Sequence, residues 1–327
     1  MKKSKTQVES NLAKRQRYGA ILLPYSVSFE RLIEATQHVE ELGFDSVWIS
    51  DHLQRDTTPT HECWTTISAL SAWTSKILIG SLATCNSFRN PALLAKMVAT
   101  VSQISCGRTD LAIGLGYDRS EHEAYGYAFP KFDERVERLS ESLEILRLLL
   151  SKKKTNFAGK YWKLHDTVCE PKPVGRMPRI WVAGRNPSVF KASSGRAYGI
   201  NILPYSGVME KRRISSFDEL EIISKQIKGF KLKRSMYCGD GGLVIGRNQG
   251  DYEARVQRLS SNQNISVSSL KQRIQNLSIL HGTIKECETS LDRLASLGFE
   301  ELMMIFPGWQ NGDYSNMDIF AREFIGS

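Results

Sequence analysis

Eight short apolar runs alternate along this chain with longer segments of helical periodicity, and this alternation constrains the fold more than any other feature. The runs lie at residues 18–23, 46–50, 77–83, 109–113, 179–183 and 199–203, within 236–245, and at 301–306. Strands that alternate with helices favour a parallel sheet whose faces are covered by helices. Eight such units in 327 residues predict an α/β fold, a closed (β/α)8 TIM barrel rather than an open doubly wound sheet.

The chain outside these runs predicts one domain with insertions. Helical spacing covers residues 29–42, 63–74, 91–105, 131–150, 187–194, 217–229, 251–259, 268–277 and 284–297. Insertions at 151–177 and 246–282 interrupt the alternation, and residues 157–162 in the first predict a small hairpin. Residues 1–17 carry a net charge of +5 and few large apolar side chains, which predicts a basic, disordered tail ahead of a single domain at 18–327.

Composition argues against several classes of protein. The content of 41% hydrophobic and 24% charged residues is that of an ordinary globular protein. No apolar run approaches the roughly 18 residues of a membrane span, and the basic start lacks the apolar stretch of a secretory signal, so we expect a cytoplasmic protein without membrane contact. The six cysteines are scattered and no H-E-x-x-H occurs, so we expect no metal site. The basic tail lacks interleaved aromatic residues, which argues against nucleic acid.

Polar residues follow three of the strands at the point where each ends. Asp51-His52 follow the second strand, Thr84-Cys85-Asn86 the third and Gly114-Leu115-Gly116-Tyr117 the fourth. The carboxyl ends of parallel barrel strands open on one face, where the active site lies, so we expect these residues to converge. His52 is the candidate general acid or base, because imidazole exchanges protons near neutral pH and an adjacent carboxylate can orient it. Trp64 either walls the pocket or packs in the core.

The Gly114-Leu115-Gly116 run does not fit a dinucleotide fingerprint. Arg119 stands where the third glycine is required, and the run follows the fourth strand rather than the first. It predicts instead a tight turn that lets the backbone approach a ligand, with Tyr117, Asp118 and Glu121 beside it.

A second turn, at residues 183–188, leads from the fifth strand into a helix. The N–H groups and positive dipole end of a helix start suit an anion, and Arg185 adds a forked donor for phosphate. The alternative is a plain loop in which Ser188 caps the helix.

In combination these segments resemble the luciferase-like monooxygenase superfamily, and within it the branch that uses the deazaflavin coenzyme F420. The resemblance covers nearly the whole chain from Tyr18 onward and implies a (β/α)8 barrel with the isoalloxazine-like ring at the C-terminal mouth. The matching segments, in order, are residues 43–48, 51–52, 62–66, 89–96, 107–108, 114–117, 121–122, 124–126 and 171–173.

Carried over position by position, the resemblance implies a role for each site residue. Asp51 is expected to contact the cofactor and His52 to lie near its reactive ring. Leu82-Ala83 falls where the family has a bulge with a non-prolyl cis peptide against the ring. The remaining expected contacts are with the cofactor for Thr84, Gly116, Tyr117, Ser120, Ala183, Gly184, Arg185, Asn186, Ser188 and Val189, and with the substrate for Trp64 and Glu121.

Two positions depart from the family pattern. The family often has consecutive glycines where Arg185-Asn186 stand, which changes the expected phosphate turn. Tyr117 replaces a glutamate that serves as a second acid in some relatives, so Asp118 and Glu121 become candidates for that role.

Three functions follow from this reading. The first is hydride transfer between an unidentified small-molecule substrate and coenzyme F420, with His52 as general acid or base. The second is a monooxygenase of the same fold that uses reduced FMN, and the third is a non-catalytic flavin-binding barrel. Residues 62–66 favour F420, and the family resemblance implies a homodimer.

Overall fold

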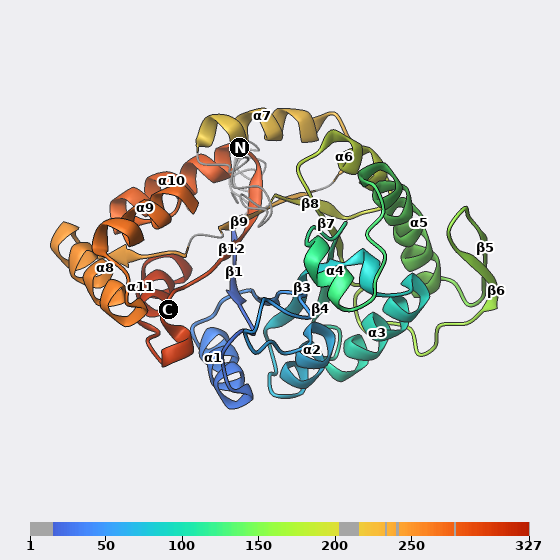
Figure 1. Cartoon of the computed structure of the whole chain (residues 1–327), viewed down its shortest axis with the longest axis horizontal. Helices are drawn as coiled ribbons and strands as arrows, with labels where there is room; N and C mark the ends of the chain where they lie inside the picture. The colour runs from blue at the N-terminus through green and yellow to red at the C-terminus, as the bar shows by residue number, and fades with distance from the viewer. Residues whose placement is uncertain (1–15, 203–215, 233, 240–241, 278, 327) are drawn as a thin grey trace, which may run out of the picture.

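The computed structural model describes residues 16–202, 216–232, 234–239, 242–277 and 279–326, and it confirms the predicted barrel. Eight parallel strands close in the order β1-β12-β9-β8-β7-β4-β3-β2 (Figure 1). Barrel strands that are consecutive in the sequence pair with one another. The first strand also pairs with the last, with Arg17 opposite Glu301, and this pairing closes the barrel. The strands are β1 (Arg17–Leu22), β2 (Ser46–Ile49), β3 (Leu78–Cys85), β4 (Thr109–Gly114), β7 (Ile180–Ala183), β8 (Gly199–Ile202), β9 (Arg234–Gly239) and β12 (Phe299–Met304).

Helices form a ring outside the strands (Figure 1). Several start where the sequence offers a side-chain cap, such as Ser28, Asn90 and the capping box of Thr283 with Glu286. The helices are α1 (Phe29–Glu41), α2 (Cys63–Ala72), α3 (Pro91–Ile104), α4 (Arg119–Ala124), α5 (Phe132–Ser151), α6 (Pro187–Ser193), α7 (Phe217–Lys228), α8 (Gln249–Gln263), α9 (Val267–Leu277), α10 (Ile284–Ser296) and α11 (Ser315–Phe320).

The core has two layers, because successive strand residues point to opposite faces. On β2, Val47 and Ile49 join the large cluster between strands and helices, whereas Trp48 points into the barrel. The interior is filled by side chains from most of the strands, so the barrel is packed rather than hollow. Its members are Ile21, Trp48, Leu78, Leu82, Ala112, Trp181, Met236, Met303 and Ile305.

The insertions add small elements outside the barrel. The predicted hairpin is present but longer, with antiparallel β5 (Thr155–Ala158) and β6 (Lys163–Thr167), and it lies beyond α5 at the edge of the molecule (Figure 1). Strands β10 (Ile245–Gly246) and β11 (Gly282–Thr283) pair in parallel beside α8, α10 and α11.

The seventh strand, the eighth strand and the N-terminal tail have boundaries that differ from the prediction. The seventh barrel strand occupies residues 234–239 only, and 245–246 form the separate β10. The eighth begins at Phe299, because Gly298 adopts φ +89° and turns the chain straight from helix to strand. Of the predicted tail, residues 1–15 lie outside the described residues. Gln16 and Arg17 belong to the barrel, since Gln16 donates to the carbonyls of Leu291 and Phe299. Among the described residues no helix has the length and apolar character to span a membrane.

Candidate active site

A bulge interrupts β3 near its carboxyl end. The peptide between Leu82 and Ala83 is cis, as the resemblance implied, and the pairing with β4 shifts register between Ser81 and Thr84. The Trp64 indole donates to Thr84 Oγ1 at 3.1 Å, and Thr84 donates to Ser81 Oγ at 2.7 Å. Trp64 is 1% exposed, so in this structure it packs in the core and supports the bulge from behind.

Asp51 is held in a buried ion pair. Its carboxylate accepts two bonds from Arg89 and one from the backbone N–H of Cys85 at 2.8 Å. Arg89 also donates to Glu62, which caps α2 by accepting from Thr65 N at 2.6 Å. Burial alone would lower the pKa of Arg89, but the Asp51 carboxylate outweighs it and raises that pKa. The side chain of Asp51 has no exposed surface, so it anchors the ends of β2 and β3.

His52 lies at the centre of a hydrogen-bonded chain of three side chains. Its Nδ1 is 3.0 Å from Glu121 Oε2, and its Nε2 is 3.1 Å from the hydroxyl of Tyr117. The other oxygen of Glu121 accepts the backbone N–H groups of Leu53 and Gln54. A buried carboxylate with these donors accepts the Nδ1 proton, which leaves Nε2 of the neutral ring as an acceptor.

The carboxylate that orients His52 is therefore Glu121 and not the adjacent Asp51. A carboxylate does orient the imidazole, as expected, but it is not the adjacent Asp51, because that carboxylate is paired with Arg89. Glu121 comes from α4, a six-residue helix that was not predicted from the sequence. Its only local signal is the Asp118 cap, which accepts from Glu121 N at 3.3 Å.

The turn before Tyr117 is fixed on both sides. Gly116 has φ +76°, and a Cβ placed there would lie 2.6 Å from Cys85 Sγ. Arg135 donates to the carbonyl of Gly116, and its guanidinium lies over the Phe129 ring at 4.2 Å. The predicted tight turn is present, and it holds Tyr117 against His52.

A second histidine, His122, lies behind this turn. Its Nδ1 is 2.6 Å from the carbonyl of Asp118 and its Nε2 is 3.7 Å from Cys85 Sγ, an arrangement that suits a neutral ring accepting the thiol proton. Burial lowers the pKa of His122, and burial together with the Asp51 charge raises the pKa of Cys85 to about 12. Ser120 donates to Asp118 Oδ1 at 2.6 Å.

The predicted phosphate turn follows β7. Asn186 caps α6 by accepting from Ser188 N at 2.9 Å, so the cap is Asn186 and not Ser188. Gly184 N donates to Asn201 O at 3.1 Å and Val189 N donates to Asn186 O at 2.9 Å. Three N–H groups of this turn therefore have protein partners, and phosphate binding here stays a prediction.

Small residues meet where these strands end inside the barrel. A Cβ added at Gly114 would lie 3.6 Å from the Cβ of Ala183 and 3.8 Å from that of Ala83. Asn201 pairs with Ala183 in register and donates to Met236 Sδ at 3.0 Å. Its Oδ1 is buried without a hydrogen-bond partner among the described residues. This part of the barrel is therefore lined by small side chains and holds one buried polar atom that lacks a hydrogen-bond partner among the described residues.

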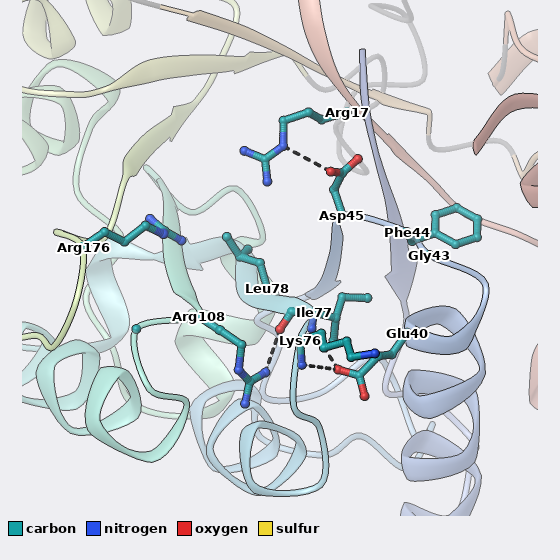
Figure 2. Close-up of a pocket in the computed structure, with 11 residues that line it drawn as sticks. Arg17, Glu40, Gly43, Phe44, Asp45, Lys76, Ile77, Leu78, Arg108 and Arg176 are labelled. Carbon is teal, nitrogen blue, oxygen red and sulfur yellow. Dashed lines mark hydrogen bonds and ion pairs between the residues drawn. The ribbon is translucent and has the colours of Figure 1, made fainter. Parts of the chain in front are cut away.

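The opposite end of the barrel holds a hollow of about 450 Å³ (Figure 2). Figure 2 shows Arg17 facing Asp45, and Arg108 and Glu40 bonded to neighbouring groups. Because it adjoins the amino ends of the strands, the end that serves stability in such barrels, we assign it no catalytic role. It is lined by Arg17, Glu40, Gly43, Phe44, Asp45, Lys76, Ile77, Leu78, Gly107, Arg108 and Arg176.

Comparisons with known proteins place this site in a family context. The model of the luciferase-like monooxygenase family matches residues 11–213, which include every predicted site residue. An F420-dependent glucose-6-phosphate dehydrogenase of Amycolatopsis mediterranei is 36% identical over 172 residues, which cover 51% of this chain and 50% of that protein. An F420-dependent hydroxymycolic acid dehydrogenase of Mycobacterium tuberculosis is 33% identical over 165 residues, covering 48% and 46%. The chain spans about half the length of the curated relatives it matches.

Solved structures share the fold at low identity. The coenzyme F420-dependent tetrahydromethanopterin reductase of Methanopyrus kandleri has a TM-score of 0.74 at 18% identity, covering 95% of this chain and 99% of that one. An F420-dependent secondary alcohol dehydrogenase, in complex with an F420-acetone adduct, has a TM-score of 0.71 at 18% identity and the same coverage. The monooxygenase RslO1 of Streptomyces bottropensis has a TM-score of 0.74, also at 18%, covering 94% and 98%.

Proposed function

This chain belongs to the luciferase-like monooxygenase family, and from that premise we propose that it is an oxidoreductase that transfers a hydride between coenzyme F420 and the carbinol carbon of a small-molecule alcohol. The F420-dependent dehydrogenases among its relatives support the choice of cofactor. They also support an alcohol as the substrate class.

The observation that carries the proposal is the pair formed by His52 and Glu121. Oxidation of an alcohol releases a hydride from carbon and a proton from oxygen. F420, when bound, supplies a hydride acceptor or donor in its deazaflavin ring. The protein has to supply the proton acceptor, and His52 is suited to this because Glu121 fixes its tautomer and stabilises the imidazolium.

The residues present fit this cofactor. The small side chains of Ala83 and Ala183, with Gly114 between them, suit the close approach of a flat ring. The orphaned oxygen of Asn201 is an acceptor, which suits an N–H group of such a ring. The bulge at Leu82-Ala83 and the turn at residues 183–189 are the segments that would hold the ring and the phosphate of the tail.

A paired titration tests the proposal. The purified protein is titrated with F420 and, separately, with FMN, and binding is read by fluorescence and calorimetry. The F420 complex is then tested against secondary alcohols and sugar phosphates, including glucose 6-phosphate, by F420 absorbance. We expect binding of F420 and substrate-dependent reduction.

Each of the other possible results of this experiment would contradict a specific part of the proposed function. Preference for FMN with oxygen uptake would replace the proposal by the monooxygenase. Binding of F420 without turnover on any alcohol would contradict the alcohol class, and flavin binding without any redox activity would support a non-catalytic barrel. The homodimer and the cytoplasmic location stay predictions, and sedimentation velocity tests the first.

A further inference from the structure

We infer that Tyr117 is the residue that exchanges a proton with the substrate, and that His52 acts from behind it. The inference rests on the proposed function, since it assigns the path of the proton released with the hydride. It begins from the observation that both ring nitrogens of His52 already have partners, Glu121 on Nδ1 and the Tyr117 hydroxyl on Nε2.

The exposed fraction falls along this series of hydrogen-bonded side chains, from Tyr117 through His52 to Glu121. Tyr117 is 36% exposed, the His52 side chain 12% and the Glu121 side chain 3%. The Tyr117 ring also stands edge-on to the imidazole, with centroids 5.5 Å apart. Tyr117 is therefore the member of the three that is most accessible to a molecule in this part of the mouth.

A second tyrosine, Tyr25, adjoins His52 but is not suited to the same role. Its ring centroid is 6.2 Å from the imidazole, and its hydroxyl is 2.6 Å from Ser50 Oγ. Burial raises the pKa of Tyr25 to about 12, which makes its proton harder to release. Of these two tyrosines, Tyr117 has the hydroxyl within hydrogen-bond distance of Nε2.

The directions of the hydrogen bonds suit proton transfer in both reaction directions. Glu121 accepts from Nδ1–H, so Nε2 accepts from the Tyr117 O–H. In alcohol oxidation the substrate hydroxyl gives its proton to the Tyr117 oxygen while Tyr117 gives its own to Nε2. As the C–H bond breaks, its electron pair would be accepted as a hydride by F420 held at the bulge of Leu82-Ala83, and the C=O bond would form. His52 ends as an imidazolium beside Glu121, and carbonyl reduction runs the same steps backwards.

The position of the phenol depends on fixed backbone. Gly116 and the Arg135 bond to its carbonyl hold the turn immediately before Tyr117. Such preorganisation is what a proton relay requires, because the donor and acceptor have to stay at hydrogen-bond distance without a search.

Tyr117→Phe tests the inference, because it removes the hydroxyl and leaves the ring. We expect kcat to fall by about 100-fold or more, with the dissociation constant of F420 changed by less than about twofold. Tyr125→Phe is the matched control, since the Tyr125 hydroxyl donates to Leu53 O at 3.0 Å and not to His52. A kcat of Tyr117→Phe within about threefold of the control would overturn the relay.

A second readout needs no cofactor. In ¹⁵N imidazole spectra of the apoprotein we expect His52 to show protonated Nδ1 and bare Nε2, and Tyr117→Phe to move the Nε2 signal alone. An unmoved Nε2 signal would overturn the relay even if activity is lost. If the protein binds no F420, the proposed function fails by titration, while the spectra still decide whether Tyr117 is bonded to His52.

Discussion

The guanidinium of Arg89 spans both carboxylate oxygens of Asp51, with N–O distances of 2.5 and 2.8 Å. A third bond of 2.7 Å joins it to Glu62 at the start of α2. The Arg89 side chain is 9% exposed, and that of Asp51 is not exposed at all. The pair connects β2, β3 and α2 at the point where His52 leaves its strand, so it fixes the frame of the site.

Removal of this guanidinium is expected to be costly. Arg89→Leu leaves a buried carboxylate without its partner, and we expect a loss of roughly 3–5 kcal/mol in the free energy of unfolding. Arg119→Leu is the control, because its pair with Glu123 is exposed on both sides and worth at most about 1 kcal/mol. Urea unfolding of both variants measures the difference, and addition of Asp51→Asn to Arg89→Leu should restore part of the loss. Equal losses in the two arginine variants would contradict a structural role for the pair.

Glu121 is expected to act on catalysis through His52. Glu121→Gln keeps the shape but replaces a carboxylate oxygen with an amide that cannot stabilise the imidazolium, so we expect kcat to fall by about 100-fold. Glu123→Gln, two residues along the same helix and exposed, should leave kcat unchanged. The measurement is F420 reduction at saturating substrate, together with F420 titration to show that binding persists. Loss of F420 binding in Glu121→Gln would indicate a direct cofactor contact instead.

Alanine substitutions at Gly116 and Gly126 distinguish the effect of backbone strain from that of a steric clash. Both have positive φ, +76° and +74°, but a Cβ at Gly116 would lie 2.6 Å from Cys85 Sγ, whereas a Cβ at Gly126 would have no atom of the described residues within 4 Å. Gly126→Ala should therefore lower the free energy of unfolding only by the strain of a left-handed residue, about 1 kcal/mol. Gly116→Ala should lower it by distinctly more. Urea unfolding checks this order. In a Cys85→Ala background the difference in unfolding free energy between the two glycine variants should become smaller. An unchanged difference would argue against a clash with Cys85.

The neutral His122 predicts a dependence of stability on pH. Burial lowers its pKa in the folded state below that of the unfolded chain, so the unfolded state binds more protons in the acidic range. Its contribution to stability is present above about pH 6.5 and is lost as the pH falls through the unfolded and then the folded pKa. The fall in unfolding free energy between pH 7.5 and 5.5 should be smaller in His122→Gln. The exposed His165→Gln should keep the wild-type slope, and identical slopes in all three proteins would contradict the prediction.

Cys85 is expected to be chemically inert although it lies at the site. With a pKa of about 12 its thiol stays protonated at pH 8, and it is also buried. Iodoacetamide should modify the exposed Cys106 in the native protein and Cys85 only after unfolding. Mass spectrometry of the two peptides provides the measurement, and rapid native labelling of Cys85 would show that the turn at Gly116 opens.

Most of the barrel could be predicted because strands buried on both faces appear as apolar runs with helical spacing between them. The short helix α4 could not, because six residues with two glutamates and a histidine carry no periodic signal. The bond between His52 and Glu121 joins positions 69 apart, and that between Asp51 and Arg89 joins positions 38 apart. Such pairs depend on how loops fold over strand ends, and local sequence patterns do not encode this. The cofactor contacts expected from the resemblance, at residues 183–189 above all, stay predictions.

The pairing of β1 with β12 has a consequence for synthesis of the protein. Gln16 bonds to a carbonyl of Phe299, a residue 283 positions later, and the strands beside them join the first and last parts of the barrel. Until Phe299 has left the ribosome, β1 and β9 each present an unpaired edge, and exposed strand edges recruit other chains. Nascent or truncated chains that stop short of β12 are therefore the forms most exposed to aggregation. Translation has to reach the eighth barrel strand before the first can be fully paired.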